Sequence, residues 1–219
     1  MAAVSCRPAT PASIAGAARL LRDGALAIVP TDTVYGIVAD CAIAEAVRAI
    51  RSAKGRAEDE PLQLLFGPDI EMLRGYADLA GPAGRLVDEL GPGPWTIVAP
   101  VVPGWTSEAL AGGATIGFRI PDSPVVQKLV AELGGPVAAS SANRHGQPSP
   151  LTCAEAVAGV GTFCAVALDD GPGRAGIDST VIDCTGKSVR VLREGAIDRA
   201  TVARILGVRS ILVVRSVRK

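Results

Sequence analysis

The sequence is poor in aromatic residues and has no net charge. Phe, Trp and Tyr make up 3% of the 219 residues, so a stacking platform for unpaired bases, which needs several exposed rings, is not expected. The 22 Lys and Arg residues balance 22 Asp and Glu residues, so no overall field draws the chain to nucleic acid or to a membrane. Any anion-binding site must therefore be local.

The sequence also lacks C-x-x-C motifs and long apolar segments. Its five cysteines are Cys6, Cys41, Cys153, Cys164 and Cys184, and none of them forms a C-x-x-C pair. The sequence contains one histidine that could act as a further metal ligand. This pattern favours buried free thiols over a disulfide framework or a zinc site. No segment approaches the roughly 20 apolar residues that span a bilayer, and the N-terminal segment lacks the form of a signal peptide. We therefore expect a cytoplasmic protein without a membrane partner.

Short apolar segments alternate with helical patterns along the chain. Residues 25–30, 62–66 and 95–102 are typical of strands, and residues 124–133 are typical of a helix opened by proline. Strands that alternate with helices, followed by several consecutive strands, predict an α/β domain with a twisted sheet of mixed parallel and antiparallel strands. The 48% of hydrophobic residues suffice for a substantial core, so we expect a single domain.

The hydroxyl-rich segment PTDTVYG joins two predicted strands. It places Thr31, Asp32 and Thr33 at a strand end. Ligands bind at strand ends in open α/β sheets, which makes these residues candidates for a site. Turn chemistry, in which Asp and Thr side chains bond to their own backbone, is the alternative.

A second polar segment, AASSANRHGQPSP, follows a later predicted strand. Its small hydrogen-bonding side chains are Ser140, Ser141, Asn143 and Ser149. Such groups suit phosphate oxygens or a hydrated metal ion, because they donate hydrogen bonds without blocking approach. A serine hydrolase that uses the nearby His145 is the alternative, but the G-x-S-x-G elbow is missing.

Basic residues fall at the ends of several predicted elements. Lys54 and Arg56 end a helix, where one cation would face the negative end of the helix dipole. That explanation accounts for a single charge, and Arg119 and Arg193 lie at the ends of predicted strands. Arginine is costly there unless its guanidinium meets a carboxylate or phosphate. The pattern therefore predicts cations directed at an anion.

Four segments together resemble the YrdC/TsaC family of threonylcarbamoyl-AMP synthases. They are PTDTVYG, the K-x-R of Lys54 and Arg56, the S-x-N of Ser141 and Asn143, and the S-T-V that begins at Ser179. They occur in the family's order within about residues 24–195. The resemblance implies a single YrdC-like domain, placed at residues 8–207, with a large concave cavity, followed by a basic tail at 208–219.

The resemblance also implies an activity and its partners. Members of the family are nucleotidyltransferases that condense L-threonine, bicarbonate and ATP into threonylcarbamoyl-AMP and release pyrophosphate. Mg²⁺ is expected to arrive with ATP, without a dedicated protein metal site. The product supplies the threonylcarbamoyladenosine modification of tRNA through a downstream transfer complex.

Roles for individual residues follow from the same resemblance. The residues implied for threonine are Thr33, Arg119, Ala139 and Ser179. The residues implied for the nucleotide are Lys54, Arg56, Glu60, Thr115, Ser141, Asn143, Ser149 and Arg193. Lys54 and Arg56 would be catalytic, because two like charges 4 Å apart repel by about 4 kcal/mol at an intermediate dielectric constant and need neutralisation before they react.

Three positions depart from the family's motif. Ala57, Glu60 and Leu65 stand where proline, asparagine and histidine are common. Glu60 would repel a triphosphate unless it meets a metal or an arginine, and Leu65 removes a polar contact near threonine. The departures put substrate choice in question more than the fold, and we expect the short, single-domain type.

Two other functions remain open. A protein that binds double-stranded RNA or tRNA without turnover would use the basic tail, which contains Arg209, Arg215, Arg218 and Lys219, although the neutral net charge argues against it. A related enzyme that forms another carbamoyl adenylate is the second alternative. YrdC-like domains of this kind occur in hydrogenase-maturation proteins, together with zinc-finger cysteines that this sequence lacks.

Overall fold

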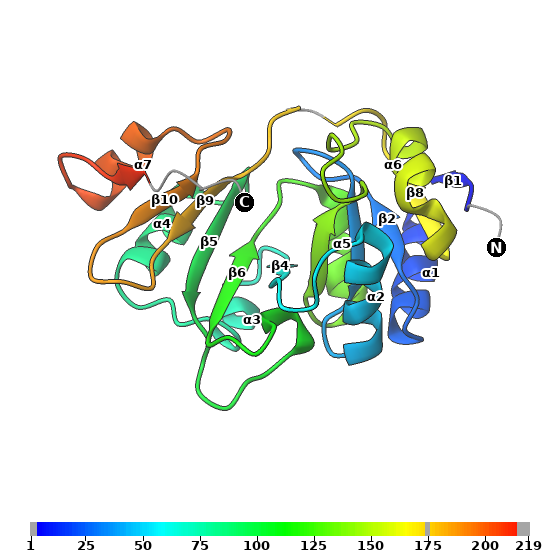
Figure 1. The fold of residues 1–219 in the computed structure, drawn as a ribbon, viewed down its shortest axis with the longest axis horizontal. Helices are drawn as coiled ribbons and strands as arrows, with labels where there is room; N and C mark the ends of the chain where they lie inside the picture. The colour runs from blue at the N-terminus through cyan, green and yellow to red at the C-terminus, as the bar shows by residue number, and fades with distance from the viewer. Residues whose placement is uncertain (1–3, 174–175, 214–219) are drawn as a thin grey trace.

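The strands form one mixed sheet in the computed structural model, which describes residues 4–173 and 176–213 (Figure 1). The strands are β1 (Cys6–Pro8), β2 (Ala27–Val29), β3 (Gly36–Asp40), β4 (Gln63–Leu65), β5 (Trp95–Pro100), β6 (Thr115–Arg119), β7 (Val137–Ser141), β8 (Val166–Asp169), β9 (Thr180–Asp183), β10 (Arg190–Arg193) and β11 (Leu212–Val213). Their order across the sheet is β1-β8-β2-β3-β7-β4-β6-β5-β9-β10-β11. Pairs such as β4 with β6 are parallel, whereas β3 with β7 is antiparallel. The predicted α/β class with a mixed sheet is confirmed.

Helices pack on both faces of this sheet. They are α1 (Pro11–Arg22), α2 (Ala44–Lys54), α3 (Ile70–Arg74), α4 (Pro82–Leu90), α5 (Pro124–Leu133), α6 (Cys153–Val160) and α7 (Arg199–Leu206), with short 3-10 turns η1 (Glu108–Leu110) and η2 (Gly161–Phe163). Buried residues of α1 and α5 form one core cluster with Ala27 and Val29 of β2, whereas Ile28 belongs to the larger cluster that α2, α4, α6 and α7 cover. Successive strand residues point to opposite faces, so the two clusters lie on opposite sides of the sheet.

The face that carries α1 and α5 is only partly covered by them. Along β5, Thr96 lines a cavity on this face, whereas the next residue, Ile97, is in the opposite core. Along β6, Arg119 lines the same cavity, whereas Phe118 is in the core. The two-residue period of the strands therefore directs polar side chains to the open part of this face.

Local signals explain why α2 ends where the site begins. Lys54 is its last residue, and Gly55 follows with φ 69° in the left-handed region, which glycine adopts without steric cost. The Arg56 backbone N–H then donates to the Arg51 carbonyl oxygen at 3.0 Å. This C-cap turns the chain sharply after Lys54, so that Lys54 contacts Asn143 whereas Arg56 contacts Glu60.

One expectation about cysteine is wrong. Cys6 and Cys153 form a disulfide with a Cα–Cα distance of 6.2 Å, although 147 residues separate them. Pairing of β1 with β8 brings Cys6 to the start of α6, and no local pattern could reveal this contact. The other three cysteines, Cys41, Cys164 and Cys184, are free thiols as predicted, but only Cys41 is buried and the other two are partly buried.

The C-terminal region is described as far as Val213. Leu212 and Val213 form β11, which pairs in parallel with β10. Residues 214–219, which hold three of the four cations of the predicted basic tail, lie outside the described residues. The domain boundaries at residues 8 and 207 stay a prediction. Within the described residues, every helix is too short or too polar to cross a membrane.

Candidate active site

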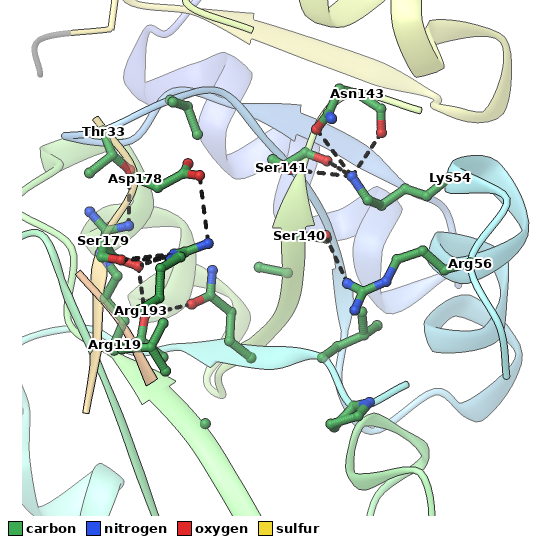
Figure 2. A pocket seen from close by; sticks show the side chains of 18 of the residues that line it. Thr33, Lys54, Arg56, Arg119, Ser140, Ser141, Asn143, Asp178, Ser179 and Arg193 are labelled. Carbon is green, nitrogen blue, oxygen red and sulfur yellow. Dashed lines mark hydrogen bonds and ion pairs between the residues drawn. The ribbon is translucent and has the colours of Figure 1, made fainter. Parts of the chain in front are cut away.

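A cavity of about 490 Å³ opens on the partly covered face of the sheet, and Figure 2 shows polar side chains on two sides of it. The first group, which we call the Arg119 end, contains Thr33, Arg119, Asp178, Ser179 and Arg193. The second group, which we call the Lys54 end, contains Lys54, Arg56, Ser140, Ser141 and Asn143. All of these residues line the one cavity, so four cations from three distant segments of the chain face the same space.

The guanidinium of Arg119 is buried, and three of its five N–H groups donate to the protein. Its residue is 3% exposed, and its Nε donates to the Gly93 carbonyl oxygen at 3.0 Å. Nη1 donates to Thr33 Oγ1 at 3.0 Å, and Nη2 pairs with Asp32 Oδ1 at 2.5 Å. Burial lowers the pKa of Arg119 below its usual value, and the Asp32 carboxylate opposes that shift. The ion pair therefore holds one rigid cation at the cavity wall.

The residues of the PTDTVYG segment make two different kinds of contact. Thr31 Oγ1 donates to the Val34 carbonyl oxygen at 2.6 Å and accepts from the Thr33 backbone N–H at 3.2 Å, which is turn chemistry. Asp32 and Thr33 instead bind Arg119. The turn thus fixes the segment, while Thr33 lines the cavity and Asp32 pairs with Arg119 behind it.

Ser179 and Arg193 are held together by a close backbone contact. Arg193 donates from Nε and Nη2 to the Ser179 carbonyl oxygen at 3.0 and 2.9 Å, and from Nη2 to Ser179 Oγ at 3.0 Å. A side chain at Gly195 would place its Cβ 2.6 Å from the Ser179 carbonyl carbon, so only glycine permits this approach. The Gly195 backbone N–H donates to Thr180 Oγ1 at 3.0 Å, and this hydrogen bond holds the Gly195 backbone against the Ser179–Thr180 backbone.

Lys54 crosses to the S-x-N motif at the end of β7. Its ammonium, on a residue 4% exposed, donates to the Asn143 carbonyl oxygen at 2.7 Å, to Asn143 Oδ1 at 3.2 Å and to Ser141 Oγ at 3.3 Å. Burial, and to a smaller extent the positive charge of Arg56, lowers the pKa of Lys54 to about 8, while Asp178 opposes the shift. The K-x-R and S-x-N motifs therefore form one unit.

Glu60, which would repel a triphosphate if it faced the cavity, instead pairs with Arg56. Arg56 Nη2 and Nε both contact Glu60 Oε2, and Arg56 Nη1 reaches Ser140 Oγ at 3.5 Å. The Arg56 side chain remains 23% exposed and lines the cavity, which Glu60 itself does not. Glu60, the acid that departs from the family's motif, thus lies outside the cavity lining, and Arg56 lies within it.

The other predicted residues divide into two groups. Thr115 and Ala139 line the cavity. Ser149 does not line it, but its hydroxyl donates to Asp178 Oδ1 at 3.4 Å. Leu65, at 1% exposed, packs in the core cluster of α1 and α5. The binding roles of Thr115, Ala139 and Ser149 remain predictions.

Sequence reasoning missed the roles of three polar residues of the site. Asp32 is a general candidate at a strand end in the sequence, but its specific role, pairing with Arg119, is not predicted there. Asp178 lines the cavity directly before Ser179, and Gln63 accepts from Thr96 Oγ1 at 3.0 Å inside it. Two signals were present, because Asp32 and Asp178 each precede a motif residue and Gln63 alternates with the buried Leu64.

Known proteins are similar to this chain in sequence and in fold. The Sua5/YciO/YrdC family model, described as "Telomere recombination", matches residues 19–195. A Mycobacterium tuberculosis protein, named provisionally as a threonylcarbamoyl-AMP synthase, is 38% identical over 197 residues, which cover 89% of each chain. The threonylcarbamoyl-AMP synthase of Bacillus subtilis is 36% identical over 199 residues, which cover 89% of this chain and 56% of that one.

A solved structure agrees with these sequence matches. Sua5 from Pyrococcus abyssi, complexed with L-threonine, superposes with a TM-score of 0.88 at 30% identity, covering 97% of this chain and 62% of that chain. The matched family region contains both ends of the cavity. This chain therefore belongs to the Sua5/YciO/YrdC family.

Proposed function

We propose that this protein forms threonylcarbamoyl-AMP and pyrophosphate from L-threonine, bicarbonate and ATP. The observation that carries the proposal is the convergence of Lys54, Arg56, Arg119 and Arg193 on one cavity of about 490 Å³. That volume lies in the usual range for small-molecule sites. Two of the three reactants are anions, and the third has a carboxylate, so a cavity with this charge suits all of them. The names of the family members similar to this chain support the same reaction.

We assign threonine to the Arg119 end and the nucleotide to the Lys54 end. Thr33, Arg119, Ala139 and Ser179, which all line the cavity, would hold threonine. The nucleotide set would be Lys54, Arg56, Thr115, Ser141, Asn143, Ser149 and Arg193, with Glu60 acting through Arg56. Arg193 lies at the Arg119 end, where it could meet the phosphate that becomes bonded to the threonine part.

The reaction needs positioning and charge neutralisation rather than a protein nucleophile. The threonine amine reacts with bicarbonate to give an N-carboxylate, and one of its oxygens attacks the α-phosphorus of ATP while pyrophosphate leaves. Both partners in that second step are negative, and their repulsion is about 4 kcal/mol at 4 Å in an intermediate dielectric. Lys54 and Arg56 would lower this barrier as preorganised cations, together with the Mg²⁺ that accompanies ATP.

The product would serve tRNA modification. A mixed carbamic–phosphoric anhydride is reactive, so a downstream transfer complex must take it to the tRNA adenosine before water does. We place this chemistry in the cytoplasm, where ATP, threonine and tRNA occur together.

A single assay tests the proposal against its alternatives. The protein is incubated with labelled ATP and bicarbonate, with and without threonine, and pyrophosphate and a new adenylate are measured. We expect both products only when threonine is present. Products that need another donor instead of threonine would favour a related carbamoyl-adenylate enzyme. An absence of turnover, with RNA affinity that falls steeply with salt, would favour an RNA-binding protein.

A further inference from the structure

The cavity contains one charged group that its anionic ligands do not explain. Within residues 4–173 and 176–213, the side chains that line it include four cations and a single carboxylate, Asp178. Figure 2 shows this carboxylate between Thr33 and Arg193 at the Arg119 end. A carboxylate in this cavity repels phosphate and bicarbonate. Its presence is explained if one of the ligands carries a positive group that pairs with it.

The backbone holds Asp178 firmly while its carboxylate stays accessible. The Ala196 backbone N–H donates to the Asp178 carbonyl oxygen at 3.2 Å, next to the close contact made by Gly195. Ser149 Oγ donates to Asp178 Oδ1 at 3.4 Å, and the side chain remains 44% exposed. A ligand in the cavity can therefore reach this carboxylate at a fixed position.

A purely structural role explains Asp178 poorly. Its Oδ2 lies 3.6 Å from Arg193 Nη1, and both side chains are nearly half exposed, so this ion pair contributes little. Arg193 is already fixed by three hydrogen bonds to Ser179. The arginine would keep its place without the carboxylate.

We propose that Asp178 binds the α-ammonium group of threonine and accepts the proton that this group must lose before it reacts. The inference rests on the proposed function and adds a catalytic residue to it. Threonine brings one carboxylate, which the cations of the Arg119 end can pair, and one ammonium group. Asp178 adjoins Ser179, and it is the carboxylate within the described cavity lining that can pair that ammonium group.

The proton balance gives the carboxylate a definite step. Most of the free amino acid carries its amine as ammonium at neutral pH, and that form has no lone pair for attack. Transfer of one proton from nitrogen to an Asp178 oxygen leaves a neutral amine. The nitrogen lone pair then forms the N–C bond with bicarbonate, the C–OH bond breaks, and the leaving hydroxide takes the second amine proton as water. The protonated Asp178 later returns its proton to solvent.

Binding measurements test the contact to the ammonium group. Wild-type protein and Asp178→Asn are titrated by calorimetry with L-threonine and with the isosteric hydroxy acid that carries a hydroxyl in place of the α-amino group. We expect the wild type to prefer threonine by about tenfold or more, because the hydrogen bond between two charged groups is lost with the analogue, and the variant to lose most of this preference. A preference that is unchanged in Asp178→Asn would overturn the inference.

Kinetics test the proton transfer. Asp178→Asn should lower turnover by about 10²–10⁴-fold, the range for loss of a positioned base. The residual rate should rise about tenfold per pH unit near neutrality, because only the substrate fraction that is already deprotonated can react. Asp178→Glu should restore part of the rate. The charged groups around this carboxylate are Arg193, Arg119 and Lys54, and their side chains are unchanged in these variants.

Controls separate this inference from the proposed function. Asp88→Asn changes an exposed acid on α4 and should leave the rate and the pH profile unchanged. If the wild type releases no threonine-dependent pyrophosphate, the proposed function itself fails. If the wild type is active and Asp178→Asn keeps its rate and its pH profile, only the role of Asp178 fails.

Discussion

The Arg119 end and the Lys54 end of the cavity hold their cations in different ways. Arg119 is 3% exposed and has a buried carboxylate partner, Asp32, whose side chain is 9% exposed. Lys54 is 4% exposed, but its four hydrogen bonds all go to neutral oxygens of Ser141 and Asn143. The Arg119 end is therefore electrically balanced before a ligand arrives, whereas the buried charge of Lys54 is not.

This difference matches the ligands that we assign to the two ends. Threonine is a zwitterion without net charge, and a balanced, rigid wall can select it by shape and hydrogen bonding. A triphosphate is a polyanion, and an incompletely neutralised lysine beside a partly exposed arginine gains most from its arrival. Changes at the Arg119 end should therefore reduce stability, and changes at the Lys54 end should reduce ligand affinity and turnover.

The largest expected effect is the loss of stability when Arg119 loses its partner. Asp32→Ala leaves a guanidinium buried without its carboxylate, which typically lowers the free energy of unfolding by about 3–5 kcal/mol. Denaturant unfolding measures this change. The double variant Asp32→Ala/Arg119→Met should recover much of the loss, because it removes both charges. A single variant as stable as wild type would show that the Arg119 end is not balanced by this pair.

The second expected effect is on turnover at the Lys54 end. Arg56→Ala should slow pyrophosphate release by about 10²-fold or more, the scale for removing a preorganised donor to developing charge. Its stability should change little, because the side chain is partly exposed. Arg74→Ala, which removes an arginine 55% exposed on α3, is the matched control and should keep full activity. An unchanged rate in Arg56→Ala would contradict the assignment of the nucleotide.

The third expected effect is a pH dependence that belongs to the Lys54 end. Because the pKa of Lys54 is lowered to about 8, ATP affinity should fall as pH rises through that value, by up to about tenfold per pH unit. Stability should move in the opposite direction, because the unfolded chain keeps the proton up to about pH 10.4 and so binds more protons than the folded one in this window.

Calorimetry in buffers of different ionisation enthalpy checks the pH effect directly. ATP binding at pH 8 should take up protons in the wild type, since the phosphates favour the charged lysine. Lys54→Met should bind ATP more weakly and without this uptake. Proton uptake that persists in Lys54→Met would assign the effect to another group.

The smallest expected effect concerns Glu60. Its ion pair with Arg56 joins side chains that are 37% and 23% exposed, and such pairs contribute roughly 0.2–1 kcal/mol. Glu60→Gln should release Arg56 and tighten ATP binding by about two- to fivefold. Glu71→Gln, on α3, is the matched control. Weaker ATP binding in Glu60→Gln would instead mean that Glu60 positions Arg56 for the nucleotide.

Elements with strong local signals could be predicted from the sequence. The Thr10 hydroxyl at the N-cap of α1 accepts from the Ser13 backbone N–H, and Gly55 ends α2 in the left-handed conformation. The sequence does not predict α6, because the small residues of this helix show no clear helical period. Its capping box of Thr152 and Glu155 is a local signal that indicates only where the helix begins. The three-residue β1 was missed because an exposed edge strand has no apolar alternation.

The sequence by itself determined the strand and helix pattern, the ordered motifs and the placement of basic residues at element ends. These depend on neighbours along the chain, on the period of side chains and on the φ preferences of glycine and proline. Only the tertiary structure decided that Asp32 neutralises Arg119, that Lys54 meets Asn143 and that Cys6 pairs with Cys153. The partners in these contacts are separated by 87, 89 and 147 residues, so their energies arise only after the sheet has brought distant strands together.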